Sequence, residues 1–231
     1  MRVMAMLTLM VAGSVWAADP KYPATEAFLM PRDREIALAR SAGPETISGR
    51  ATVKVLTRTG YEVAERGDND CVCLVMRGWS AIRFVPTDGH AAAYDSKVLA
   101  PICFDPLASR TILPQEELRA TLGLQGVAPA AIASELAMAY AEGKLPRMEG
   151  VQFGYMWSAD QDVGEDDAWH PHMMIYAPYY RNSMLGGHAP DSGLPSVVVD
   201  EGGPFALIVV AVPDQLAIKP QAHSPGGAKH H

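Results

Sequence analysis

The chain has 231 residues, of which 48% are hydrophobic and 19% are charged, values close to those of ordinary globular domains. This composition argues against disorder and against a membrane protein with several spans, and the length predicts one domain, or at most two small ones. With 19 Lys and Arg against 26 Asp and Glu, the net charge is −7, which argues against nucleic-acid binding because such proteins usually carry a basic excess.

The N-terminus has the features of a secretory signal peptide. Arg2 supplies a positive charge, residues 3–15 form an apolar run, and Val15 and Ala17 occupy the two small-residue positions of a cleavage site. The run is shorter than the ~20 residues that cross a bilayer. We therefore expect a signal peptide over residues 1–17 that is cleaved near Ala17, no membrane span in the mature chain, and a periplasmic or secreted location.

The first half of the mature chain predicts one helix and then closely spaced strands. The helix is expected over residues 32–40, because Pro31 suits its first turn and Gly43-Pro44 ends it. From Ala51 the hydrophobic period changes to two, as in half-buried strands. The predicted strands cover residues 52–56, 61–65, 71–76 and 79–85. Tight turns between them favour an antiparallel meander.

The second half predicts two helices, over residues 115–122 and 129–142, and then a return to strands. The predicted strands cover residues 151–158, 172–177, 197–199 and 205–212, the last two as a hairpin. This order predicts an α+β fold, in which an antiparallel sheet of several short strands is packed by two or three helices. We expect one domain over residues 18–218 and a disordered tail over residues 219–231, which are polar and small.

Three cysteines, Cys71, Cys73 and Cys103, lie in a chain that we expect to be exported, where disulfides form. Cys71 and Cys73 are two residues apart in a predicted strand, so their Cα atoms lie about 6.6 Å apart, near the upper limit for a disulfide. A bridge from either of them to Cys103 fits better and leaves one thiol over. Unpaired buried thiols are the main alternative. Metal binding by the Cys-Val-Cys pair is a weaker one, because no further ligands follow at a suitable spacing.

One short segment concentrates residue types that bind metals. His170 and His172 flank Pro171, which keeps the backbone extended and would aim both imidazoles at one face. With Asp167 they make up two histidines and a carboxylate, a common ligand set for a divalent metal such as zinc. The alternative is a solvated loop leading into a strand, in which His172 packs beside Tyr176.

The strand after Pro171 carries further expectations. Pro171 lacks a backbone donor, so the strand should begin there or lie at an edge of the sheet. Met173 and Ile175 should face the core, and nearby carboxylates should raise the pKa of both histidines.

Two other features of this region suggest ligand binding. The acidic loop over residues 160–167 suits calcium, which prefers oxygen ligands, although it lacks the spacing of the 12-residue calcium loop. Aromatic side chains suit a groove for a sugar or a peptide. These are Trp157, Trp169, Tyr176, Tyr179 and Tyr180. Aromatic core packing is the alternative.

Six short stretches of the mature chain occur in a distinctive order. They are Ala39–Pro44, residues 51–56, Gly60–Val63, Cys73–Val75, residues 172–178 and Leu207–Val210. In this order they resemble a family of short exported bacterial proteins that carry no assigned function. In that family one cysteine precedes Leu-Val and another precedes an aromatic-Asp pair. The resemblance therefore implies a disulfide between Cys73 and Cys103, with Cys71 left over, and it implies no reaction, cofactor or substrate.

The sequence lacks the common signatures of serine hydrolases, zinc proteases and nucleotide-binding enzymes. This favours an exported, non-catalytic domain that binds an unknown ligand or a protein partner. The alternative is a metal-dependent enzyme, a hydrolase that uses His170 and His172.

Overall fold

The structure is a computed structural model and describes residues 22–79, 94–161, 170–187 and 194–221. The expected signal peptide, most of the strand expected over residues 79–85, Asp167, Trp169 and the end of the expected tail lie outside these residues. No helix within the described ranges combines the length and the apolarity that crossing a bilayer requires.

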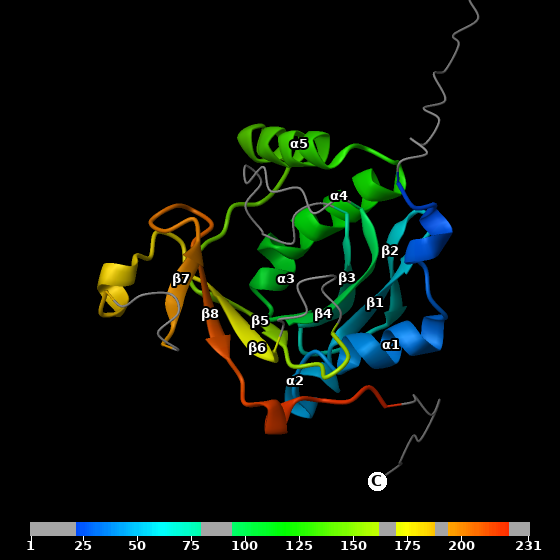
Figure 1. Cartoon of the computed structure of the whole chain (residues 1–231), viewed down its shortest axis with the longest axis horizontal. Helices are drawn as coiled ribbons and strands as arrows, with labels where there is room; N and C mark the ends of the chain where they lie inside the picture. The colour runs from blue at the N-terminus through cyan, green and yellow to red at the C-terminus, as the bar shows by residue number, and fades with distance from the viewer. Residues whose placement is uncertain (1–21, 80–93, 162–169, 188–193, 222–231) are drawn as a thin grey trace, which may run out of the picture.

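Eight strands form a single sheet in the order β2-β1-β3-β4-β5-β6-β8-β7 (Figure 1). The strands are β1 Thr52–Thr57, β2 Gly60–Glu65, β3 Val72–Gly78, β4 Asp95–Phe104, β5 Gln152–Met156, β6 His172–Tyr176, β7 Ser196–Val199 and β8 Leu207–Ala211. All neighbours are antiparallel except β1 and β3. The predicted α+β class is confirmed, with a larger sheet than expected.

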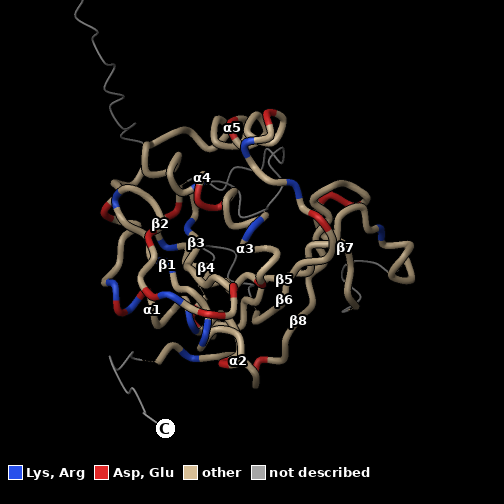
Figure 2. The backbone as a smooth tube through the Cα atoms, turned by 180° about the vertical axis from the view of Figure 1, so that it is seen from behind, with Lys and Arg blue, Asp and Glu red and all other residues tan. Residues whose placement is uncertain are grey.

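Helices cover both faces of the first half of the sheet (Figure 1). They are α1 Arg32–Arg40, α2 Glu45–Ser48, α3 Ala108–Thr111, α4 Leu113–Leu124 and α5 Pro129–Ala141, with the 3-10 turns η1 Thr25–Phe28, η2 Asn182–Leu185 and η3 Asp214–Leu216. Helix α1 packs on β1, β3 and β4, whereas α3 and α4 contact β5 and β2. Charged residues are absent from β5, β6, β7 and β8, as the tan tube of Figure 2 shows.

The predicted meander is wrong, because β3 pairs in parallel with β1 and leaves β2 at the edge of the sheet. The physical reason lies in the burial of each strand. Strand β3 is buried along nearly its whole length and needs a neighbour on each side, while β2 carries exposed positions such as Glu62 and Val63. The half-polar strand therefore takes the edge.

Strand β4 was not predicted, because Pro101 lies in the middle of it. Cys73 and Cys103 are paired across β3 and β4 with their Cα atoms 4.0 Å apart, the close spacing of a pair without mutual hydrogen bonds. Backbone groups point to alternate sides along a strand, so Pro101, two residues before Cys103, has the same backbone orientation as Cys103. The nitrogen of Pro101 therefore faces away from β3. On that other side β5 pairs only with Cys103 and Phe104, so the missing N–H costs no ladder bond.

A disulfide joins the two central strands, between Cys73 and Cys103, as the family resemblance implied. Both cysteines lie in the core between the sheet and α1, with Val53 and Val75. Cys71 is a buried free thiol. Burial, helped by Asp105 and Asp70, raises the pKa of this thiol, which keeps it protonated and unreactive near neutral pH.

Buried polar side chains fill the gap where β1 and β3 separate after only two paired positions. The Leu56 N–H donates to Glu35 Oε1 over 3.0 Å, and the Tyr61 hydroxyl donates to the Val75 carbonyl over 2.6 Å. Arg77 Nη2 lies 2.8 Å from Glu35 Oε1, and the same guanidinium donates to the carbonyls of Phe28 and Val75. Glu35 and Arg77 thus replace ladder bonds that the diverging strands cannot make.

The outer edge of β7 is occupied by a side chain. Asn182 Oδ1 accepts from the Val197 N–H at 2.8 Å, and Asn182 Nδ2 donates to the Val197 carbonyl at 3.3 Å. The amide group therefore pairs with Val197 as a neighbouring strand would, which protects an edge that is flanked by the exposed Val198.

Candidate functional site

The two histidines of the metal prediction differ sharply in exposure. The side chain of His170 is 75% exposed and its Nδ1 lies 3.4 Å from Asp214 Oδ1. His172 is 6% exposed, and its Nδ1 donates to the carbonyl of His170 over 2.8 Å. His172 therefore acts as a packed side chain that fixes the start of β6.

Two expectations about β6 are corrected. The start of the strand is as predicted, because β6 begins directly after Pro171, and the strand lies between β5 and β8. The face that carries His172, Met174 and Tyr176 is the more buried one, because Met174 and Tyr176 join the core below α3 and α4. Burial consequently lowers the pKa of His172, where nearby carboxylates were expected to raise it.

The metal prediction is not tested by the described residues. Asp167 lies outside them, and within them no three His, Cys, Asp or Glu side chains are grouped so as to hold a metal ion. Tyr176 cannot line the predicted aromatic groove, because its side chain is completely buried. Tyr179 and Tyr180 are exposed.

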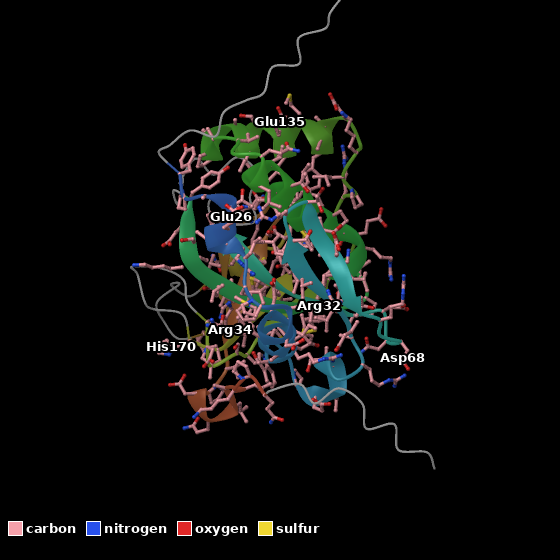
Figure 3. All side chains as sticks on the ribbon, turned by 90° about the vertical axis from the view of Figure 1, so that its right-hand side faces the viewer. Glu26, Arg32, Arg34, Asp68, Glu135 and His170 are labelled. Atoms are coloured by element: carbon pink, nitrogen blue, oxygen red, sulfur yellow. A yellow bond between two sulfur atoms is a disulfide. The ribbon has the colours of Figure 1, made fainter. Side chains whose placement is uncertain are left out.

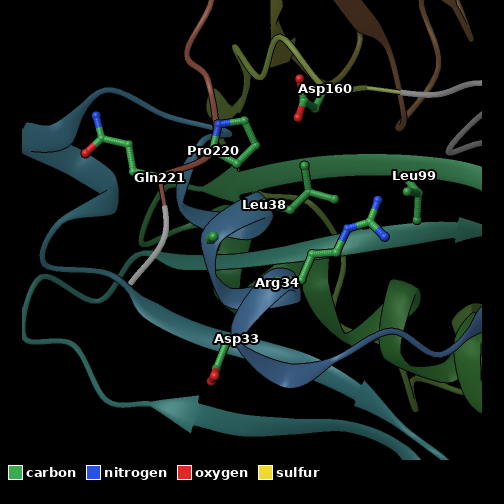
Figure 4. Close-up of a pocket in the computed structure, with 8 residues that line it drawn as sticks. Asp33, Arg34, Leu38, Leu99, Asp160, Pro220 and Gln221 are labelled. Atoms are coloured by element: carbon green, nitrogen blue, oxygen red, sulfur yellow. The ribbon is translucent and has the colours of Figure 1, made fainter. Parts of the chain in front are cut away.

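A cleft of about 450 Å³ opens between α1, the start of β4 and the C-terminal segment (Figure 4). It is lined by Asp33, Arg34, Ala37, Leu38, Leu99, Asp160, Pro220 and Gln221, and we call it the α1 cleft. Its volume falls within the ~300–1,000 Å³ of ordinary small-molecule pockets.

Helix α1 supplies one wall of the cleft by its periodicity. Arg34, Ala37 and Leu38 are three and four residues apart, so they share one side of the helix. Leu38 is buried against the core, and Ala37 is small enough to leave space above it. Seen along the helix, Arg32 and Arg34 project to opposite sides (Figure 3), and Arg32 donates to the Ala64 carbonyl on β2.

The opposite wall depends on a backbone clip between two distant segments. The Ile218 N–H donates to the Trp157 carbonyl and the Ala159 N–H donates to the Ile218 carbonyl, both over 2.8 Å. Ser158, between them, bonds through its hydroxyl to the hydroxyl of Ser41 over 2.7 Å. This clip places Pro220 and Gln221, which the sequence assigned to the tail, beside the cleft.

The α1 cleft combines an apolar floor with two opposite charges. The Arg34 guanidinium lies between Leu38 and Leu99, the Asp160 carboxylate lies on the other side of Leu38, and the Asp33 carboxylate points away from both (Figure 4). In the part of the chain that the structure describes, neither Arg34 nor Asp160 has an ion-pair partner. A ligand can therefore use both charges.

Little in the sequence indicates this cleft. Asp160 belonged to the acidic loop, whereas Arg34, Leu99 and Gln221 showed no local pattern beyond the spacing on α1. The cleft joins residues from positions 33 to 221, and only the folded sheet and the clip bring them together.

Comparison of the chain with protein-family models, with curated proteins and with solved structures found no match. The family resemblance of the short stretches stays a prediction.

Proposed function

We propose that the chain is an exported domain that binds a small organic ligand in the α1 cleft without transforming it. The observation that carries this proposal is a cleft of about 450 Å³ whose lining combines apolar side chains with two exposed charges that no described residue neutralises. Convergent polar groups around an apolar surface are the usual features of ligand sites.

The lining residues favour binding over catalysis. Among the described residues the lining includes no histidine, cysteine, serine, lysine or tyrosine, the residue types that most often act as nucleophiles or general bases. The carboxylate of Asp33 points away from that of Asp160 (Figure 4), so the two do not form an acid–base pair.

The buried disulfide supports the exported location. Disulfides persist in secreted and periplasmic proteins and are rare in the reducing cytosol. The bond between Cys73 and Cys103 lies in the central core of the domain, so we assign it a structural role in an oxidising compartment, in line with the N-terminal signal features.

A cleft-blocking variant tests the proposal. N-acetyl-leucinamide, a small neutral apolar probe, should shift the backbone amide NMR signals of residues 33–38, 99 and 218–221 in the full mature chain. Leu99→Trp should abolish these shifts by filling the cleft. Leu216→Trp, at an exposed leucine that does not line the cleft, is the matched control. Equal shifts in wild type and Leu99→Trp, or shifts confined to other surfaces, would refute binding in the cleft.

A further inference from the structure

Arg34 differs from the other arginines of α1 in having no described partner. Arg40 pairs with Glu65 at 2.6 Å, and Arg32 donates to the Ala64 carbonyl over 2.9 Å. Arg34 projects toward Leu99 (Figure 4), and no described residue accepts a hydrogen bond from its guanidinium. A planar guanidinium in this position presents a fork of donors that matches the two oxygens of a carboxylate.

Asp160 supplies the complementary charge from the opposite wall. Its backbone N–H donates to Ser158 Oγ over 3.2 Å, which orients the residue just after the clip with Ile218. Its carboxylate has no described partner and can accept from an ammonium group. A purely anionic ligand would meet this carboxylate unfavourably, and a purely cationic ligand would meet Arg34 in the same way.

We propose that the ligand of the α1 cleft is a dipolar molecule with an apolar body, namely a hydrophobic α-amino acid or short peptide. Its carboxylate binds Arg34, its ammonium group binds Asp160, and its side chain lies on Ala37, Leu38 and Leu99. This inference rests on the proposed function and adds the chemical class of the ligand. Opposite charges on the two walls, with apolar side chains beside them, favour this class.

Five probes test the inference by isothermal titration calorimetry of the full mature chain, and two of them differ from leucyl-leucine in one terminal group each. They are leucine, leucyl-leucine, N-acetyl-leucyl-leucine without the ammonium group, leucyl-leucinamide without the carboxylate, and neutral N-acetyl-leucinamide. Because charge-assisted hydrogen bonds at an open site are worth about a factor of ten in affinity, each lost charge should weaken binding about tenfold.

Two variants assign each charge to its residue. Arg34→Gln should weaken leucyl-leucine and its N-acetyl form about tenfold and leave the amide unchanged. Asp160→Asn should weaken leucyl-leucine and its amide and leave the N-acetyl form unchanged. Arg50→Gln and Asp68→Asn, at an exposed ion pair that does not line the cleft, are matched controls and should change nothing.

The outcomes separate this inference from the proposed function. If N-acetyl-leucinamide binds as tightly as leucyl-leucine in wild type and in both variants, the dipolar ligand is wrong and ligand binding in the cleft stands. If no probe binds at millimolar concentration, both are wrong. If leucine shows the same dependence on Arg34 and Asp160 as the dipeptide, the ligand is a free amino acid. Binding of the dipeptide alone identifies a peptide.

Discussion

The ion pair between Arg77 and Glu35 gives the sharpest test of the fold. Its side chains are 0% and 1% exposed, respectively, and Arg77 also donates to two backbone carbonyls. Removing one partner of a buried pair costs about 3–5 kcal/mol, because the other charge stays buried without compensation. Against a typical total stability of about 5–15 kcal/mol, Arg77→Met should leave the protein close to unfolding.

The paired replacement should be far milder than the single one. In the double variant Glu35→Leu with Arg77→Met, no charge remains in the gap, and the Tyr61 hydroxyl still donates to Val75. Replacing a buried pair by apolar residues of similar volume is often neutral, but here the Leu56 N–H loses its acceptor, which costs about 1–3 kcal/mol. The double variant should therefore be more stable than Arg77→Met alone.

The stability lost in Arg77→Met should also depend on pH. Burial raises the pKa of Glu35 above its usual 4.5, although Arg77 opposes this shift. Without Arg77 the folded state should hold the Glu35 proton to still higher pH than the unfolded chain does. The folded state then binds more protons, so its stability falls as pH rises above about 4.5. Arg77→Met should thus lose more stability at pH 8 than at pH 5, relative to wild type.

Urea unfolding followed by tryptophan fluorescence measures these differences directly. We expect wild type, Glu35→Leu/Arg77→Met and Arg77→Met in decreasing order of stability at pH 8. A loss below about 1 kcal/mol for Arg77→Met, the size of an ordinary hydrogen bond, would contradict the reasoning. So would a double variant less stable than Arg77→Met.

Three further outcomes follow from features outside this pair. Cys73→Ser should lower the free energy of unfolding by about 3–4 kcal/mol, as expected for opening a loop of 30 residues, while Cys71→Ser should retain the crosslink in non-reducing peptide mapping. Burial lowers the pKa of His172 below 6.5. The contribution of neutral His172 to stability is therefore complete above pH 6.5 and is lost as pH falls through the lowered pKa. His172→Asn should remove this pH dependence from the melting temperature in thermal scans, and a pH profile identical to that of wild type would contradict this expectation. Asn182→Ala should free the edge at Val197 and produce concentration-dependent association in analytical ultracentrifugation, whereas a monomer at all concentrations would argue against edge protection.

Local signals predicted the elements better than their arrangement. Helix α1 has the predicted bounds, because Pro31 and Gly43-Pro44 mark its ends within the chain itself. The position of β3 beside β1 depends on which strand is buried on both faces, and this is decided by α1 and α4 rather than by the turns. Pro101 made β4 hard to predict, because a proline fits inside this strand only where the pairing with β5 is too short to need its backbone N–H.

The candidate site was harder to predict because it too depends on how distant elements are arranged. His170 and His172 are close in sequence and share a phase, yet the interior position of β6 buries one imidazole while the other remains exposed. Arg34 and Asp160 are 126 positions apart (160 − 34). Their common cleft depends on backbone hydrogen bonds of Ile218, which no hydrophobic periodicity in the sequence predicts.

The clip at Ile218 makes the segment up to Gln221 part of the α1 cleft. Removing Pro220 and Gln221 would take away their part of the cleft lining and leave Asp160, the clip at Ile218 and the sheet in place. The shape of the cleft can therefore be changed at this segment without touching the core of the domain.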